Sequence, residues 1–285
     1  MEPLTHRISA WDGLKLHIRE WPGDPSKPPI LCLPGLVRTG ADFELVVPGL
    51  PPGHRVVAID YIGRGDSDYA RDVARYLPEP WARDVIDICA ALHVHRAMIL
   101  GTSFGGLLAM GLASIYPSLV SGVVLNDIGP DVATEGRNFV HDFVALDPAL
   151  GSVEACVAHL RKVLPPLSLE TEADWRRMAE LTYRRGPDRL YHPLWDVRIA
   201  RTLNAPTPDL WAMWRSLAHV PVMLVWGEAS TLLLAGTVAR MRQDRPDMRV
   251  VSLPGIGHAP ILTEPPALDA IHGFVHAWAT AHRRH

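Results

Sequence analysis

The amino-acid sequence predicts an α/β protein with a mostly parallel central sheet and helices on both of its faces. Three observations carry this prediction. Short apolar runs recur along the chain, and stretches with a helical spacing of apolar residues separate them. Most of these runs are apolar throughout, as expected for strands that are covered on both faces of a parallel sheet. With 285 residues, 48% of them hydrophobic, the chain can also bury the large core that such a sheet needs.

The runs expected to form strands cover residues 14–21, 29–33, 55–60, 97–102, 121–126, 221–226 and 249–253. The first run alternates between apolar and polar residues after the Asp12-Gly13 turn, so we expect it to be half-buried at the edge of the sheet. Helices are expected over residues 81–92 and from Ser103 to Tyr116.

The pattern changes between residues 131 and 219. Apolar side chains recur there at helical spacing, as at Phe139 and Phe143, and we see no run typical of a strand. Dipeptides such as Gly186-Pro187 would separate the helices. We therefore expect an all-helical insertion. The expected division of the chain is a core made of residues 1–130 and 220–285, with residues 131–219 inserted into it.

Composition and charge exclude several classes of function. The formal net charge of −3 offers no positive field for nucleic acid, and no basic run favours a membrane surface. No segment reaches the roughly 18 to 20 apolar residues that span a bilayer, and the first residues do not have the pattern of a signal peptide. The three cysteines are scattered and unpaired in spacing. We expect a cytoplasmic protein with a small-molecule substrate and neither nucleic-acid nor membrane partners; the oligomeric state is not predicted.

Ser103 is the candidate nucleophile. It lies in Gly101-Thr102-Ser103-Phe104-Gly105, between a predicted strand and a predicted helix. A serine on such a sharp turn needs small neighbours, because the turn is strained and the helix packs closely against the strands. The turn also places Ser103 at the amino terminus of a helix, where free N–H groups favour a developing negative charge.

A serine hydroxyl needs a base to become a nucleophile near neutral pH. Among the 14 histidines, His258 has the most suitable position, because it lies in the loop between the last predicted strand and the last helix. That loop leaves the same edge of the sheet as the loop that carries Ser103. His93 and His95 lack a third ligand at metal-binding spacing, and Gly101 to Gly106 does not match the dinucleotide fingerprint, so neither a metal nor a cofactor is expected.

These features resemble those of the α/β-hydrolase family. The likeness extends over the whole chain and includes the elbow at Ser103, the loop histidine His258, the Pro34-Gly35-Leu36 turn and the glycine-rich loop at residues 60–67. The resemblance implies that the backbone N–H groups of Leu36 and Phe104 form an oxyanion hole. It also implies that the insertion is a cap over the active site.

The sequence departs from this family at the triad acid. The family usually carries a carboxylate in a loop after the next-to-last strand, where this chain has Ser230 or Thr231. A hydroxyl cannot stabilise an imidazolium by charge as a carboxylate does.

Three explanations remain open for the acid. Asp127, which ends the strand next to that of Ser103, would supply it as in some family members. Glu228 is an alternative that lies close to the expected position in sequence, but it sits nearer the end of the strand, where a glutamate is often not the acid. The third explanation has no acid at either position: a Ser103–His258 dyad, an unidentified acid, or a chain that has lost its hydrolytic activity.

The expected function is that of a serine hydrolase that cleaves an ester, a lactone or a similar activated carbonyl of a small, partly apolar substrate through an acyl-enzyme. Two other classes remain open. The same fold hosts hydrolases and lyases that break C–C bonds, and a non-catalytic protein that binds a ligand in the same pocket would also be consistent with the missing aspartate.

Overall fold

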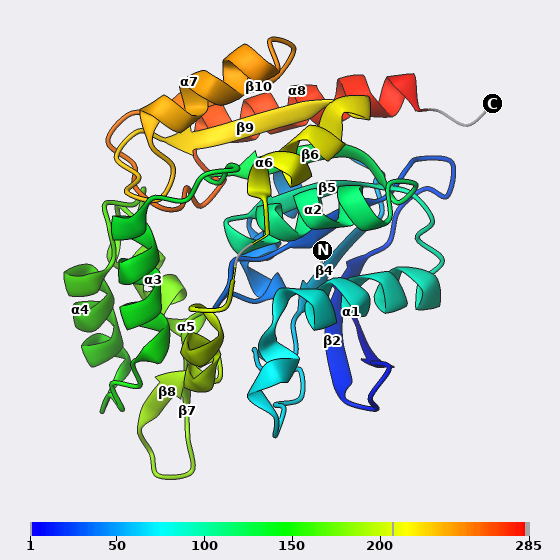
Figure 1. Cartoon of the computed structure of the whole chain (residues 1–285). Helices are drawn as coiled ribbons and strands as arrows, with labels where there is room; N and C mark the ends of the chain where they lie inside the picture. Colours follow the sequence, from blue (N-terminus) through cyan, green and yellow to red (C-terminus); the bar gives the residue numbers. More distant parts are fainter. Residues whose placement is uncertain (1, 207, 283–285) are drawn as a thin grey trace.

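The computed structural model describes residues 2–206 and 208–282 and has an eight-stranded sheet at its centre (Figure 1). The strand order is β1-β2-β4-β3-β5-β6-β9-β10. The strands are β1 (Leu4–Ser9), β2 (Lys15–Trp21), β3 (Ile30–Leu33), β4 (Val56–Asp60), β5 (Ala97–Thr102), β6 (Val120–Asn126), β9 (Val222–Gly227) and β10 (Arg249–Leu253). Strands β4 to β10 in that order are parallel, whereas β1 and β2 pair antiparallel at one end. The predicted fold class is therefore confirmed.

Helices cover both faces of this sheet. One layer contains α1 (Pro78–Ala91), α2 (Phe104–Ile115), α6 (Leu210–Arg215) and α7 (Ala235–Asp244). The other contains α8 (Pro265–Ala281) and two 3₁₀ turns at Gly40–Glu44 and Val47–Gly49. Successive residues of β3 explain why the strand runs are apolar throughout, because Leu31 packs against the first layer and Cys32 against the second. Both faces need apolar side chains, so the run has no polar alternation.

The edge of the sheet differs from the prediction. The run over residues 14–21 forms β2, but β2 pairs with β4 on one side and with β1 on the other, so it is not an edge strand. The edge strand on this side of the sheet is β1, which was not predicted. Its side chains are exposed or only partly buried, and Leu4 is 54% exposed, so the hydrophobic pattern that indicates a strand is nearly absent there.

The segment expected as an insertion, residues 131–219, contains α3 (Thr134–Ala145), α4 (Val153–Val163) and α5 (Glu172–Glu180). Its last helix, α6, packs in the layer that covers the sheet. The expectation that this segment is all-helical is wrong, because β7 (Tyr183–Arg185) and β8 (Tyr191–Pro193) form an antiparallel hairpin. Strands of three residues are too short to show a period in the sequence. Gly186-Pro187 lies in the hairpin turn, where the Gly186 N–H donates to the Leu190 carbonyl at 2.7 Å.

The insertion contacts loops that follow three strands of the sheet at their carboxyl ends. The Arg38 guanidinium, after β3, donates to the Thr182 hydroxyl at 2.7 Å. The loop after β4 bonds through the Gly65 N–H to the Leu194 carbonyl at 2.8 Å, and the loop after β10 bonds through the Gly257 N–H to the Pro166 carbonyl at 2.6 Å. The inserted segment therefore lies beside the carboxyl ends of the parallel strands, where parallel α/β proteins bind ligands. In the described ranges, no helix has the length and apolar character needed to cross a bilayer.

Candidate active site

Ser103 occupies a single-residue turn between β5, which ends at Thr102, and α2, which begins at Phe104. Its backbone has φ 51° and ψ −117°, a conformation that non-glycine residues rarely adopt. The Ser103 N–H donates to the Asn126 carbonyl of β6 at 2.9 Å, which ties the turn to the neighbouring strand. A Cβ atom at Gly105 would lie 2.0 Å from the Leu33 carbonyl oxygen, so this close approach of α2 to the sheet requires glycine.

His258 lies in the loop after β10, and its ring is close to Ser103. Its Nε2 atom is 2.8 Å from the Ser103 Oγ. Two bonds fix the surrounding loop: the Gly257 N–H donates to the Pro166 carbonyl, and the Asn126 side-chain amide donates to the Pro260 carbonyl at 2.8 Å. The fold thus brings the two side chains that the sequence indicated, Ser103 and His258, within hydrogen-bonding distance of each other.

Asp127 follows β6 directly and is fully buried. Its Oδ2 atom is 2.8 Å from the His258 Nδ1, and its Oδ1 accepts the Gly227 N–H at 3.0 Å. The residue has a φ of 53°, and its own N–H donates to the Val225 carbonyl of β9 at 2.8 Å. Of the carboxylates considered from the sequence, Asp127 is the one that the structure places against the histidine.

The residues near the expected acid position have other environments. Glu228 is exposed to solvent, while the Nδ1 of His258 faces Asp127. The buried hydroxyl of Ser230 accepts hydrogen bonds from the N–H groups of Leu232 and Leu233, both at 3.2 Å. It therefore caps the turn before α7 rather than reaching the imidazole. Thr231 is exposed.

The two backbone amides expected to form an oxyanion hole belong to segments that adjoin Ser103. Phe104 is the first residue of α2, and the first N–H groups of a helix have no partner within it. Leu36 lies in the turn after β3, and a Cβ at the preceding Gly35 would be 3.9 Å from the Ser103 Cβ. Among the described residues, the Leu36 N–H donates to no acceptor.

Asn126 also helps to position the loop of His258, a role that was not predicted from the sequence. It is fully buried, and its side-chain amide donates to both the Pro260 carbonyl and the Thr102 hydroxyl. The residue thus links the strand before Asp127 to the loop of His258. The only signal in the sequence was a polar residue directly after the apolar residues Val123 to Leu125.

This arrangement has a defined chemical capacity. An imidazole between a serine hydroxyl and a buried carboxylate can accept the serine proton, while the carboxylate fixes the tautomer and stabilises the imidazolium. N–H groups without partners next to the serine can stabilise a negatively charged carbonyl oxygen.

A family model described as the alpha/beta hydrolase fold matches residues 28–265. The chain belongs to the α/β-hydrolase family. A 3-hydroxybutyrate-oligomer hydrolase from Cupriavidus necator is 34% identical over 262 residues, which cover 88% of this α/β hydrolase and 89% of the relative. The 2-(acetamidomethylene)succinate hydrolase of Mesorhizobium japonicum is 28% identical, with 93% and 92% covered. A crystal structure of an alpha/beta hydrolase from Novosphingobium aromaticivorans superposes with a TM-score of 0.91 at 35% identity and covers 96% of this chain and 98% of its own.

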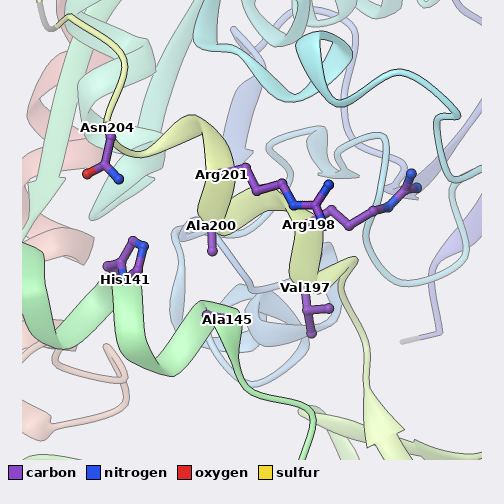
Figure 2. A pocket seen from close by; sticks show the side chains of 7 residues that line it. All are labelled: His141, Ala145, Val197, Arg198, Ala200, Arg201 and Asn204. Atoms are coloured by element: carbon purple, nitrogen blue, oxygen red, sulfur yellow. The ribbon is translucent and has the colours of Figure 1, made fainter.

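Two further groups of residues in this α/β hydrolase lie outside the serine–histidine–aspartate arrangement. A hollow of about 390 Å³ opens between α3 and the 3₁₀ turn Val197–Thr202 of the insertion (Figure 2). Neither Ser103 nor His258 lines it. His17, Asp60 and Asp66 cluster at distances suitable for a metal, but the Arg19 guanidinium already forms ion pairs with both carboxylates, at 3.0 and 3.7 Å. That cluster is an ion-pair network with its cation present.

Proposed function

We propose that this α/β hydrolase is a serine hydrolase that cleaves an ester, a lactone or a similar activated carbonyl of a small, partly apolar substrate through an acyl-enzyme. The observation that carries the proposal is the chain of two hydrogen-bonding contacts, each 2.8 Å long, from Ser103 through His258 to Asp127. In this assignment Ser103 is the nucleophile, His258 the general base and acid, and Asp127 the residue that orients the imidazole.

In the first half of the reaction, His258 Nε2 takes the proton of the Ser103 hydroxyl as Oγ attacks the substrate carbonyl carbon. The carbonyl oxygen becomes an oxyanion and accepts the Leu36 and Phe104 N–H groups. The tetrahedral intermediate collapses when His258 gives its proton to the leaving alkoxide, and the acyl group stays on Ser103. In the second half, His258 takes a proton from water, the hydroxide attacks the acyl carbon, and the carboxylic acid leaves as Ser103 recovers its proton.

The position of Asp127 supports its part in this scheme. It is fully buried, and its second oxygen is occupied by the Gly227 N–H, so its carboxylate is fixed in one orientation toward His258. A buried carboxylate stabilises the imidazolium more strongly than an exposed one, because water does not screen it. Glu228, which is exposed, lacks this advantage.

The comparison with known proteins favours the ester among the carbonyl substrates. The C. necator relative is named for its action on 3-hydroxybutyrate oligomers, and hydroxy acids joined head to tail are joined by ester bonds. We therefore expect esters of short hydroxy acids or similar small acyl groups to be better substrates than C–C bonds.

Turnover of a p-nitrophenyl ester tests the nucleophile. We expect Ser103→Ala to abolish turnover without loss of the folded state, and we expect a fluorophosphonate probe to label Ser103 in the unmodified protein. Unchanged turnover in the alanine variant would overturn the proposal. A folded protein that binds ligand but takes no label would instead indicate a binding protein. Cleavage of a C–C substrate in place of the ester would indicate a C–C bond hydrolase or lyase.

A matched pair of variants tests the acid. We expect Asp127→Asn to lower kcat by about four orders of magnitude, as loss of the charge at a triad acid does. Glu228→Gln should leave kcat unchanged. A large loss confined to the glutamine variant would transfer the role to Glu228, and two fully active variants would reject both residues.

A further inference from the structure

Arg64 is an unusual arginine because it is completely buried. It lies in the loop after β4, and its guanidinium stacks over the Trp81 ring at 4.0 Å from the centroid and near Tyr61 at 5.4 Å. Its Nε donates to the Leu36 carbonyl, and its Nη1 donates to the Ile62 carbonyl at 3.1 Å. The buried Nη2 has no partner within residues 2–206 and 208–282.

No carboxylate in the described part of the chain forms an ion pair with this guanidinium. Asp196 interacts electrostatically with Arg64 at a distance, but its carboxylate is hydrogen-bonded to Arg198 and to the Tyr76 hydroxyl. Burial lowers the pKa of Arg64 to about 9. A buried cation without an anionic partner is costly to the folded state, so the contribution of Arg64 to stability does not by itself explain its position.

The groups around Arg64 contact both residues of the oxyanion hole. Leu36 is bonded directly, through its carbonyl. The Phe104 ring packs edge to face on Trp81 at 5.2 Å and on Tyr61 at 5.8 Å. The Tyr61 hydroxyl also donates to the Pro34 carbonyl at 3.2 Å, so the turn from Pro34 to Leu36 is held at both of its ends.

We propose that Arg64 is a positioning residue of the oxyanion hole, which holds the Leu36 carbonyl and with it the turn, so that the free Leu36 N–H stays directed toward the oxyanion beside Ser103. This inference rests on the proposed function. The Leu36 N–H belongs to the peptide between Gly35 and Leu36, and both neighbouring peptides are anchored. The Pro34 carbonyl before it accepts from Tyr61, and the Leu36 carbonyl after it accepts from Arg64, so rotation of the N–H away from Ser103 is restricted from both sides. Arg64 does not touch the substrate and acts only through Leu36 and through the aromatic rings that pack on Phe104.

The test replaces Arg64 with methionine, which keeps an unbranched stem and removes both hydrogen bonds. Because the oxyanion forms only after attack, we expect kcat for a p-nitrophenyl ester to fall by about 10-fold or more while KM changes by less than about 3-fold; loss of a whole oxyanion donor costs roughly 100- to 1,000-fold. A trifluoromethyl ketone that forms a tetrahedral adduct with Ser103 should bind more weakly by a similar factor.

Arg245 provides the matched control. It is also buried, and it also donates to two backbone carbonyls, those of Leu217 at 2.6 Å and Val220 at 3.0 Å, but at the amino end of β9. Arg245→Met should lower the melting temperature without changing kcat per folded molecule. Wild-type kcat in Arg64→Met, or equal kinetic effects in the two variants, would overturn the inference.

Two further measurements keep the inference distinguishable from other failures. If Arg64→Met does not fold, Arg64→Lys serves, because a single ammonium cannot reproduce the fork that bonds Leu36 and Ile62 together. We expect its kcat to fall at least about 3-fold at unchanged KM, and wild-type kcat would count against the role. Activity in Ser103→Ala would refute the proposed function itself, whereas an inactive Ser103→Ala with a fully active Arg64→Met would refute only the role of Arg64.

Discussion

Replacing Gly105 with alanine tests how closely α2 must approach β3. The added Cβ would lie 2.0 Å from the Leu33 carbonyl oxygen and 2.8 Å from that of Pro34, whereas ordinary contacts begin at 3.4 Å. Helix or strand must therefore move by more than an ångström. Overpacking of this kind costs about 1–3 kcal/mol of unfolding free energy. This movement would change the distance between the turn of Leu36 and the amide of Phe104. A misplacement of catalytic groups by about 1 Å can lower kcat about 100-fold.

Gly111 in the same helix is the control for this substitution. A Cβ at Gly111 would have no neighbour within 4 Å. Alanine has the higher helix propensity, so Gly111→Ala should stabilise the protein by about 0.5–1 kcal/mol. In a chain of this length that corresponds to a rise of roughly 1–4 °C in melting temperature. Thermal unfolding followed by circular dichroism, together with kinetics on a p-nitrophenyl ester, measures both effects.

Two results would refute the reasoning about Gly105. Wild-type stability and kcat in Gly105→Ala would mean that α2 does not approach the sheet as closely as described. A destabilised Gly105→Ala with full kcat would mean that the position of the helix does not set the geometry of the oxyanion hole.

Three further predictions concern the hydroxyl at the expected acid position and two titrating groups. Ser230→Ala should cost about 1 kcal/mol of stability by removing the cap of the following turn, with kcat unchanged. Burial alone would raise the pKa of Asp60, but the hydrogen bond with His17 and the charge of Arg19 lower it overall from 3.8. The Asp60 carboxylate therefore stabilises the fold above its unfolded pKa of 3.8, and this stabilisation is lost as the pH falls through the lower folded pKa. We expect the urea midpoint of Asp60→Asn to depend less on pH in acid than that of the wild type. Hydrogen bonds with Asp147 and Asp188 raise the pKa of His192 above 6.5. The protonated His192 should therefore stabilise the hairpin of β7 and β8 below pH 6.5, and this stabilisation should be lost as the pH rises through the folded pKa. Hydrogen exchange of residues 183–193 measures this change.

Each of these predictions has a contrary outcome. A large loss of kcat in Ser230→Ala would assign the hydroxyl a catalytic role. Parallel acid unfolding of wild type and Asp60→Asn would mean that this carboxylate does not contribute to the acid sensitivity. Hairpin exchange with the same pH dependence in wild type and in His192→Gln would show that the pair with Asp147 does not stabilise the hairpin.

Much of the fold was predictable because the buried strands leave a strong pattern. The runs over residues 97–102 and 249–253 coincide with β5 and β10, since the apolar side chains of these strands pack against the helical layers on both faces. The two elements that were missed lack this signal. Strand β1 is exposed, and the hairpin of β7 and β8 is too short for any period to appear.

The serine and the histidine at the site were identifiable because each follows a strong strand and leaves it at the same edge of the sheet. The acid was left open for a physical reason. Asp127 and Glu228 both come directly after neighbouring parallel strands, so position along the chain favours neither. What separates them is local: Asp127 has a left-handed backbone with a φ of 53° and a buried carboxylate against the imidazole, whereas Glu228 is exposed. A sequence pattern does not encode that side-chain direction.

The placement of Asp127 on the strand beside that of Ser103 has a consequence for how the protein can change. In the proposed assignment, the spacing of nucleophile and acid is set by the ladder between β5 and β6, where the Ser103 N–H meets the carbonyl of the residue before Asp127. The loop after β9 then carries no catalytic residue. Selection, or a library of variants, can lengthen and diversify this loop beside His258 as a recognition element, while the proton-transfer unit stays within the rigid sheet and the histidine loop.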